Sequence, residues 1–251
     1  MLRAFGLTDK GHTRSVNEDC FAIHEDLGLL VVADGMGGHN AGEVAARVAV
    51  DAVVDVVRDH ERNPFPFGYD PSLSDDGNLL RTAIHVACIH VIEAAGAANQ
   101  YAGMGTTLVA ARVAAGRLSV AHAGDSRLYL LSGGRLRQVT RDDSWLATVL
   151  AADPDANPDA LQHHPMRCAL TNAVGAGVRT DVHVAEHTLG GGELVLLSTD
   201  GVHGVLDGRR LERMLLDDDD PRAIARSVID AALASGSRDN LTAVVARYHE
   251  V

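Results

Sequence analysis

The spacing of apolar positions predicts a chain built largely of short strands. The predicted strands are apolar runs bounded by Gly, Asp or Asn, and they cover residues 2–8, 20–24, 27–33, 181–189, 193–199 and 241–250. Residues 106–124 predict a hairpin with its turn at residues 115–116. A second hairpin, over residues 127–140, is predicted to turn at residues 133–134. A glycine-rich turn at residues 190–192 separates two of the strands.

Helical spacing of apolar residues predicts four helices, over residues 42–60, 78–99, 209–216 and 221–235. The second of these helices has Asp76 or Asn78 as its expected N-cap. Residues 61–77 contain three prolines and predict a surface loop. Residues 141–177 show little periodicity, so we expect a helical and irregular excursion there.

The order of these elements favours an α+β fold. Strands come first, followed by two helices, more strands, two further helices and a last strand. Hairpins indicate antiparallel sheets, because parallel neighbours need a crossover connection. We therefore expect a β-sandwich of two antiparallel sheets flanked by helix pairs, in four αββα layers. No linker or repeat interrupts the chain, so residues 1–251 are expected to form a single domain.

Composition supports a sizeable core and limits the partners. Hydrophobic residues make up 46% of the chain and aromatic residues only 4%, so the core must consist of aliphatic side chains. The formal net charge of −12 at pH 7 argues against binding to nucleic acid or an anionic membrane surface, because both require a basic patch. An anionic substrate would need a locally positive site.

The cysteines and the N-terminal residues bear on location. Cys20, Cys88 and Cys168 are isolated and odd in number, so we expect reduced thiols in a cytoplasmic protein. The chain does not open on an apolar leader, and no run was expected to approach the ~20 apolar residues of a membrane span. Nothing in the sequence requires more than a monomer.

Acidic residues at predicted strand ends carry the main chemical signal. Asp34 and Asp200 each follow an apolar strand and precede a glycine, which lets backbone approach a ligand closely. Further carboxylates in similar places are Glu18, Asp19, Asp125 and Asp239. A lone Asp-Gly pair usually marks a turn. Several carboxylates without a set of Cys or His residues suit hard cations such as Mg²⁺ or Mn²⁺, which offset the repulsion between them.

Other catalytic arrangements are missing from the sequence. It contains no GxxxxGK[ST] loop, no GxSxG elbow, no HExxH pair and no cysteine with an arginine six positions later. His85 and His90 are five positions apart, which places them off one helical face. Without an evident covalent nucleophile, a metal-activated water is the natural attacking group.

Six motifs in a fixed order carry a family resemblance. They are GHTRSVNED at residues 11–19, VADGMGGHNAGE at 32–43, MGTT at 104–107, AGDSRLYL at 123–130, LSTDG at 197–201 and SRDNLTAVV at 237–245. With these motifs the chain resembles the PPM-type metal-dependent protein phosphatases of bacteria, the 2C class, over nearly its whole length. The resemblance implies the same two-sheet sandwich with a metal channel at one end.

The resemblance also implies a ligand set for two Mn²⁺ or Mg²⁺ ions, with the attacking water activated between them. Asp34 would bridge both ions, and the Gly35 carbonyl would bind one of them. Asp200 and Asp239 would complete the protein ligands of the first ion. Residues expected to support this centre without taking part in the chemistry are Thr106, Thr107 and Asn240, the last by orienting the loop of Asp239.

Other matched residues would surround the two ions. Glu18 would lie near the second ion, and Asp19 would act mainly through water. Asp125 would join Asp200 in holding a third, weaker ion. Arg14 would clamp phosphate oxygens with its planar fork and so supply the positive charge that this acidic chain needs.

The chain departs from the family pattern in four places. Met36 stands where some relatives have a histidine that is proposed to protonate the leaving oxygen, so a water or His39 would have to serve. Asp143, Cys168 and Asn172 stand where relatives more often show His, Asn and Arg. These three lie in residues 141–177, which match the family's flap beside the metal channel, so they bear on substrate recognition.

Three functions stay open at this point. The leading hypothesis is hydrolysis of phosphoserine and phosphothreonine in proteins, with serine/threonine kinases and their substrates as partners. A second keeps the chemistry but restricts the substrate to one phosphorylated regulator. The third is a catalytically silent metal-binding module of the same fold, against which the retention of Asp34, Asp200 and Asp239 argues.

Overall fold

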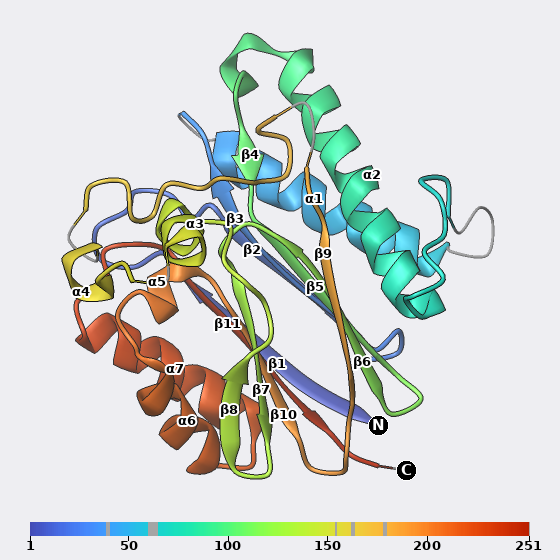
Figure 1. Cartoon of the computed structure of the whole chain (residues 1–251), viewed down its shortest axis with the longest axis vertical. Coiled ribbons are helices and arrows are strands. Elements are labelled where there is room, and N and C mark those ends of the chain that lie inside the picture. Colours follow the sequence, from blue (N-terminus) through green and yellow to red (C-terminus); the bar gives the residue numbers. More distant parts are fainter. Residues whose placement is uncertain (39–40, 60–64, 154, 162–163, 178–179, 251) are drawn as a thin grey trace.

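Two antiparallel sheets pack face to face in the computed structural model of the chain (Figure 1), which describes residues 1–38, 41–59, 65–153, 155–161, 164–177 and 180–250. The first sheet has the strand order β1 (Leu2–Asp9), β11 (Leu241–Tyr248), β10 (Leu194–Ser198), β7 (Arg127–Ser132) and β8 (Arg135–Gln138). The second has the order β2 (Asp19–His24), β3 (Leu29–Met36), β5 (Leu108–Ala114), β6 (Arg117–Ala123) and β9 (His183–Thr188), with β4 (Gly105–Thr106) beside β3.

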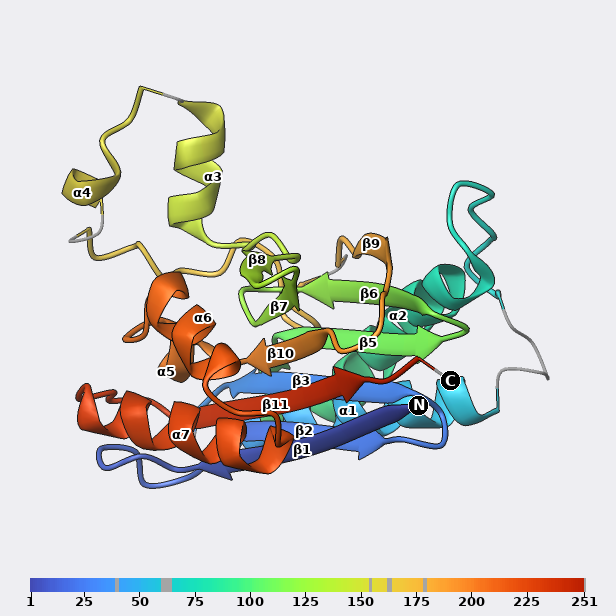
Figure 2. The ribbon, with the colours of Figure 1, turned by 90° about the horizontal axis from the view of Figure 1, so that it is seen from below.

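A pair of helices covers the outer face of each sheet. Helices α1 (Ala41–Arg58) and α2 (Asp75–Ala97) pack on the second sheet, and α6 (Gly208–Leu216) and α7 (Pro221–Ala234) pack on the first. Figure 2 shows the short helices α3 (Trp145–Ala152) and α4 (Pro158–Leu161) standing away from these layers. The remaining short elements are the 3₁₀-helix Asn99–Tyr101 and α5 (Asp200–His203). The four-layer αββα sandwich expected from the sequence is confirmed.

The continuous apolar runs in the strands follow from burial on both faces. In β10, Leu194 and Leu196 point toward α6 and α7, whereas Val195 and Leu197 point into the space between the sheets. Successive side chains of a strand alternate between its faces, so a strand covered on both sides must be apolar throughout. Strand β3 follows the same rule. Its last residues are therefore carried by a strand that is covered on both faces and so is rigid.

The predicted hairpin turns are confirmed. Ala115 and Gly116 have φ values of 48° and 74°, and Gly133 and Gly134 have values of 57° and 75°. Positive φ at both central residues matches the right-handed twist of the flanking strands. Among the described residues, Ala115 is the one residue that has a positive φ and is not a glycine.

Helix α2 begins earlier than the sequence suggested. Its N-cap is Ser74, whose side chain accepts from the Gly77 amide at 3.2 Å, so the prediction of Asp76 or Asn78 was wrong. The Asp76 carboxylate is instead paired with Arg112. The Asn78 side chain donates to backbone carbonyls of the preceding loop and is fully buried. Both candidate side chains therefore bond other partners and do not cap the helix.

The strands on either side of residues 190–192 are confirmed, but they belong to different sheets. Strand β9 pairs with β6, whereas β10 pairs with β7 and β11. The glycine-rich turn thus carries the chain from one sheet to the other. The apolar pattern of a segment predicts that it forms a strand. It does not predict which strand it pairs with, because that depends on tertiary packing.

Helix α2 is long and apolar enough, by length and composition, to cross a membrane. On that measure the expectation that no such run exists was wrong. Its buried residues, among them Leu80, Ile84 and Val91, belong to the core shared with α1 and the second sheet. This packing is that of a core helix, whose apolar side faces protein.

Truncation of the layer between the sheets should destabilise the protein strongly. Leu197 is fully buried there, so Leu197→Ala should lower the free energy of unfolding by about 2–5 kcal/mol. Chemical denaturation followed by circular dichroism measures the change. Ile89 is 43% exposed on α2, so Ile89→Ala should stay within about 0.5 kcal/mol of the parent protein. Equal effects of the two substitutions would contradict the layer assignment.

Candidate active site

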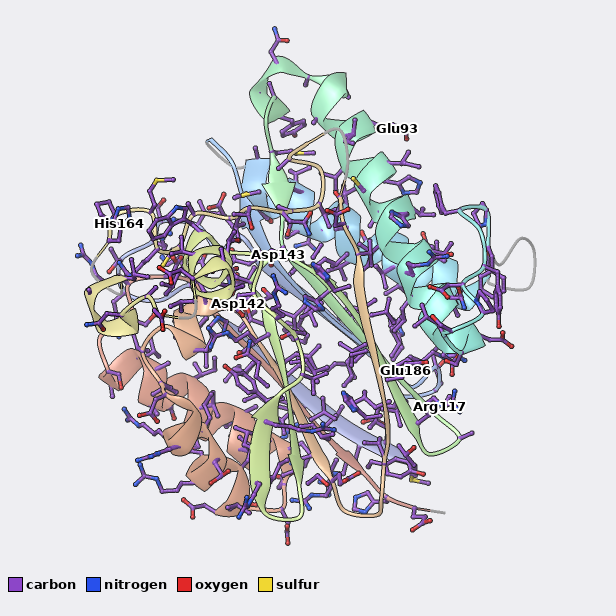
Figure 3. All side chains as sticks on the ribbon, in the orientation of Figure 1. Glu93, Arg117, Asp142, Asp143, His164 and Glu186 are labelled. Carbon is purple, nitrogen blue, oxygen red and sulfur yellow. The ribbon has the colours of Figure 1, made fainter. Side chains whose placement is uncertain are left out.

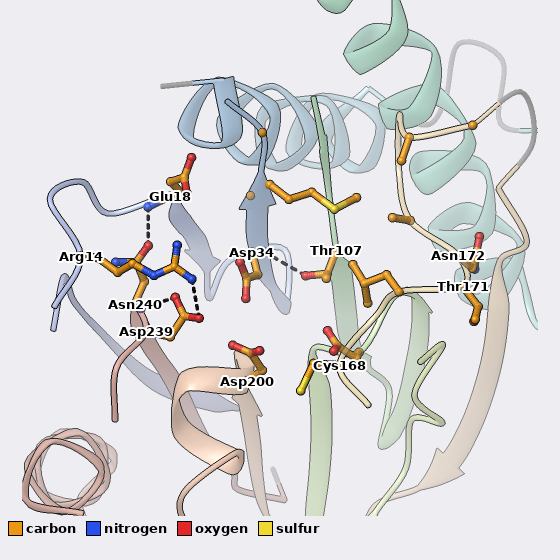
Figure 4. Close-up of a pocket in the computed structure, with 18 of the residues that line it drawn as sticks. Arg14, Glu18, Asp34, Thr107, Cys168, Thr171, Asn172, Asp200, Asp239 and Asn240 are labelled. Carbon is orange, nitrogen blue, oxygen red and sulfur yellow. Dashed lines mark hydrogen bonds and ion pairs between the residues drawn. The ribbon is translucent and has the colours of Figure 1, made fainter. Parts of the chain in front are cut away.

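Seven of the eight predicted site residues line one pocket of about 620 Å³. They are Arg14, Glu18, Asp34, Gly35, Asp125, Asp200 and Asp239. They come from both sheets: from the segments that precede β2 and β11, from the end of β3, and from the segments that follow β6 and β10. Figure 4 shows the side chains of Asp34, Asp200 and Asp239 facing one another across the pocket. Segments about 200 residues apart in the chain thus converge at one end of the sandwich.

Asp34 is fixed through its own backbone. Its amide donates to Thr107 Oγ1 at 3.0 Å, and its carbonyl accepts from Thr106 Oγ1 at 2.9 Å and from the Thr107 amide at 2.9 Å. Thr107 Oγ1 lies 2.7 Å from Ser126 Oγ. The threonines expected to support the sheet therefore hold Asp34 directly, and the supporting role of Ser126 was not foreseen.

Gly35 stands where no side chain would fit. A Cβ at this position would lie 2.0 Å from the Gly42 carbonyl oxygen, and one at Gly42 would lie 2.4 Å from Glu18 Oε1. The Gly35 amide also donates to the Glu18 carbonyl at 3.1 Å. The two glycines therefore let β3, α1 and the Glu18 segment approach one another closely beside the pocket.

Arg14 reaches the pocket from the loop between β1 and β2. Its guanidinium donates to Asp239 Oδ2 at 2.7 Å, and its side chain stays 46% exposed. Burial acts to lower the pKa of Arg14, but the hydrogen bond and the charge of Asp239 outweigh it, so the pKa is raised. Arg14 is thus a permanent cation at the mouth of an acidic pocket.

Asn240 ties the segment of Asp239 to the loop that carries Arg14. Its side chain donates to the carbonyls of Lys10 and Val16 at 2.9 and 3.0 Å and accepts from the Glu18 amide at 2.9 Å. Only its backbone amide bonds to Asp239, at 2.8 Å. The side chain therefore shapes the loop that carries Arg14, across a sequence separation of more than 200 residues. That separation hides the contact from sequence reasoning.

Asp19 is the predicted site residue that does not line the pocket. It is 8% exposed, and its Oδ2 accepts from Thr199 Oγ1 at 2.9 Å and from Thr242 Oγ1 at 2.7 Å. Its position opposite Asp34 in the β2–β3 pairing places it behind the pocket wall. Burial raises the pKa of Asp19 to about 7, although both threonine hydroxyls act to lower it.

Burial and repulsion between carboxylates raise the pKa values in the pocket. Burial is the largest cause in each case. It raises the pKa of Asp125 to about 7, with Asp200 as the next contributor. The pKa of Asp200 is raised to about 6, with Asp239 as the next contributor. The pKa of Asp34 is raised well above its usual range, with repulsion from Asp19 and then Asp200. The pocket is therefore short of positive charge.

The same residues fit divalent cations. Among the described residues, Glu18 Oε1, Asp19 Oδ1 and Asp200 Oδ1 are buried oxygens without a hydrogen-bond partner. Within those residues, no group of three or more Asp, Glu, His or Cys side chains is arranged closely enough to hold an ion by protein atoms alone. Mg²⁺ and Mn²⁺ bind through a few carboxylates and keep several waters. A pocket of spaced carboxylates with unsatisfied oxygens suits that mode of binding.

The positions that depart from the family pattern also lie at this site. Met36, Cys168 and Asn172 line the pocket, and Asp143 hydrogen-bonds Asn172. His39 lies outside the described residues. Pocket-lining residues that sequence reasoning missed are Leu170, Thr171, Ala173, Ala176, Gly177 and Asp181. They have no apolar period or charged motif to mark them, which explains the omission.

Comparison with known proteins decides the family. The family model for protein phosphatase 2C matches residues 10–245. The chain belongs to the protein phosphatase 2C family. It is 30% identical over 241 residues to a serine/threonine phosphatase stp of Listeria welshimeri, covering 95% of this chain and 92% of the relative. It is 31% identical over 247 residues to the serine/threonine protein phosphatase PstP of Mycobacterium tuberculosis, but spans only 45% of that protein.

Solved structures of family members share the fold. The serine/threonine phosphatase PstP/Ppp of Mycobacterium tuberculosis matches with a TM-score of 0.86 at 30% identity, over 99% of both chains. The PstP catalytic domain in complex with two manganese ions matches with a TM-score of 0.82 at 30% identity, also over 99% of both chains. The two-sheet sandwich that the motifs implied is the fold of this family.

The raised pKa values predict how stability depends on pH. A carboxyl whose folded pKa is raised favours the folded state while protonated, so that stability is present near pH 4 and is lost as pH rises through about 6 and 7. In EDTA, the free energy of unfolding of the wild-type protein should therefore fall more between pH 5 and 7.5 than that of Asp125→Asn. The difference should be about 1 kcal/mol for each pH unit over which the single proton of Asp125 is lost. The carboxylates of the pocket keep some contact with solvent, which screens part of the effect.

Urea denaturation at the two pH values measures both losses. Excess Mn²⁺ is the control, because it binds the ionised carboxylates and should remove the difference in slope. A wild-type protein as insensitive to pH as Asp125→Asn would show that Asp125 is not protonated in the folded, metal-free state.

Proposed function

We propose that this protein hydrolyses phosphoserine and phosphothreonine esters in proteins and requires Mn²⁺ or Mg²⁺. The observation that carries the proposal is the convergence of Asp34, Asp200 and Asp239 with one cationic side chain, Arg14, in a single pocket. The family and the names of the relatives support the same chemistry. The combination of carboxylates and a guanidinium suits a phosphate monoester, which needs both cations and a fork-shaped donor.

Asp34, Asp200 and Asp239 face one another across the pocket, which Glu18 and Gly35 also line. This lining supports Asp34 as a residue that would bridge two ions, with Asp200 and Asp239 as ligands of one and with the Gly35 carbonyl and Glu18 beside the other. Asp125 and Asp200 would hold a third ion, and Asp19 would act through water from behind the wall. When bound, the cations activate a water for attack on phosphorus and offset the charge of the phosphoryl group.

Arg14 is placed to orient the phosphate. One of its terminal nitrogens is taken by Asp239, and its exposed side chain leaves further donors of the guanidinium directed to the pocket mouth. Bidentate bonds to phosphate oxygens would fix the ester relative to the carboxylates. The ion pair with Asp239 in turn holds the guanidinium in place before substrate arrives, so little side-chain entropy is lost on binding.

Partners and location follow from the same proposal. Relatives named as serine/threonine phosphatases support phosphorylated proteins as substrates, including serine/threonine kinases and their targets. Cys20, Cys88 and Cys168 are free thiols, which supports a reducing, cytoplasmic compartment. The acidic surface charge supports protein partners over nucleic acid.

Metal dependence gives the first test of function. With Mn²⁺, the purified protein should release phosphate from a phosphothreonine peptide, and EDTA should stop the release. Loss of an outer partner of a metal ligand already costs about 10–100-fold, so Asp34→Asn and Asp200→Asn should each lower kcat by more than about 100-fold. Asp218→Asn, a change of the same charge at an exposed residue, should keep full activity.

A silent binding module would instead bind Mn²⁺ without releasing phosphate. Calorimetric titration with Mn²⁺, read together with the phosphate-release assay, therefore separates the two functions: binding with release indicates the enzyme, and binding without release indicates the module. Full activity of Asp34→Asn and Asp200→Asn would contradict the site.

Removal of the guanidinium gives a second test. Arg14→Ala should raise KM and lower kcat, because the phosphate loses a charge-assisted pair of hydrogen bonds worth about 1.5–3 kcal/mol, or about 10–100-fold in kcat/KM. Steady-state kinetics on the same peptide measures both constants. Arg135→Ala removes an exposed arginine on β8 and is the matched control. If both variants kept wild-type constants, Arg14 would be a loop residue without a role in binding phosphate.

A further inference from the structure

The carboxylate of Asp143 joins three segments at the edge of the pocket. Its Oδ2 accepts from the Gly124 amide at 3.0 Å and from Asn172 Nδ2 at 2.7 Å. Its Oδ1 lies 2.9 Å from His183 Nε2 on β9. The Asp143 side chain is only 11% exposed. A carboxylate that is largely shielded from solvent and has a partner on both oxygens is held in one orientation, and it helps to hold its partners.

The first link fixes the segment that carries Asp125. Gly124 precedes Asp125, and it both donates to the Asp143 side chain and accepts from the Asp143 amide at 3.0 Å. Gly124 has a φ of 103°, and a Cβ there would lie 2.8 Å from the side chain of Thr107. The Gly124 backbone is thus held between Thr107 and Asp143. Where Asp125 enters the pocket depends on both contacts.

The second link fixes the pocket wall after α4. The Asp143 carbonyl accepts from the Thr171 amide at 2.8 Å, and its carboxylate accepts from Asn172. The Asn172 side chain also bonds the backbone of Asp181, donating to its carbonyl at 2.8 Å and accepting from its amide at 3.2 Å. Thr171, Asn172 and Asp181 line the pocket. Figure 4 shows Thr171 and Asn172 on the side opposite Arg14.

We propose that Asp143 is a positioning residue that couples the pocket wall at Thr171 and Asn172 to Asp125. Movement of the wall relative to Gly124 must break hydrogen bonds to Asp143, so while these bonds hold, the substrate-facing wall and the segment of Asp125 move as one unit. The consequence for catalysis rests on the proposed function. Asp143 and Asn172 are two of the departures from the family pattern, and the structure pairs them with each other.

The neighbouring Asp142 provides a matched comparison. It is 15% exposed, and it pairs with Arg127 at 2.9 and 2.7 Å. Figure 3 shows the two aspartates side by side where the chain leaves the first sheet for α3. Both carboxylates are largely shielded from solvent and hydrogen-bonded, so removal of either should cost stability. Only Asp143 has bonds to Gly124 and Asn172 among the described interactions.

Hydrogen–deuterium exchange on the metal-free protein is the direct test. Asp143→Ala should speed exchange of the amides of Gly124 and Thr171 by about 10-fold or more, since each loses or loosens a bond to Asp143. Calorimetric titration with Mn²⁺ alone should show the weakest site weakened by about 10-fold, as for an outer partner of a ligand. Kinetics on the phosphothreonine peptide should show a raised KM with a smaller change in kcat.

Two further variants keep the test decisive. Asp142→Ala should lower stability while leaving exchange at Gly124 and Thr171 unchanged. Asp143→Asn keeps an oxygen for Gly124 and Asn172 and can turn its amide toward His183, so it should restore exchange and Mn²⁺ affinity to within about 3-fold of wild type. Identical changes in Asp142→Ala and Asp143→Ala, or no recovery in Asp143→Asn, would overturn the proposal.

The exchange and titration measurements need no turnover. A wild-type protein without phosphatase activity would therefore refute the proposed function and leave the coupling standing. Normal activity together with unchanged exchange in Asp143→Ala would refute the coupling and leave the function standing.

Discussion

Repulsion between carboxylates that rigid elements hold together is the constraint on which this molecule depends. Asp34, Asp200 and Asp239 cannot easily move apart, because Asp34 lies near the end of β3, Asp200 begins α5 just after β10, and Asp239 stands just before β11. Burial removes much of the water that would otherwise screen them, and their neighbours are mostly acidic. Such a cluster is stable with protons or with cations in place. At neutral pH, cations are the partner that also leaves every carboxylate ionised and able to act as a ligand.

The sandwich supplies the rigidity that makes this repulsion useful. Two strand layers carry helices on both outer faces, and the site residues arrive from both sheets at one end of the sandwich. Hydrogen bonds from Thr107 and Asn240 then fix the Asp34 backbone and the loop of Arg14. Catalysis by cations and fixed charge requires such preorganisation, because a carboxylate that could swing away would relax instead of binding an ion. The pocket wall near Asn172 lies in a loop and is held by the hydrogen bonds of the Asn172 side chain to Asp143 and Asp181.

Most of the fold was predictable, because it follows from local patterns. Strands buried on both faces are apolar throughout, and turns with positive φ call for residues such as Gly116 and Gly134. The order of motifs then indicated which carboxylates converge. What the sequence could not show are choices made by tertiary partners: Ser74 as the cap of α2, the separate sheets of β9 and β10, and the span of Asn240 to the Arg14 loop. The role of Asp143 could not be predicted either, because it depends on contacts with segments far along the chain.

We expect these carboxylates to hold hard cations within one pocket. Anomalous diffraction from crystals grown with Mn²⁺ is the decisive measurement, because it locates the Mn²⁺ ions independently of any assumption about ligands. One strong peak is expected between Asp34, Asp200 and Asp239, and a second beside Asp34 and the Gly35 carbonyl. Peaks confined to other acidic surfaces, with the pocket holding only water at saturating Mn²⁺, would contradict it.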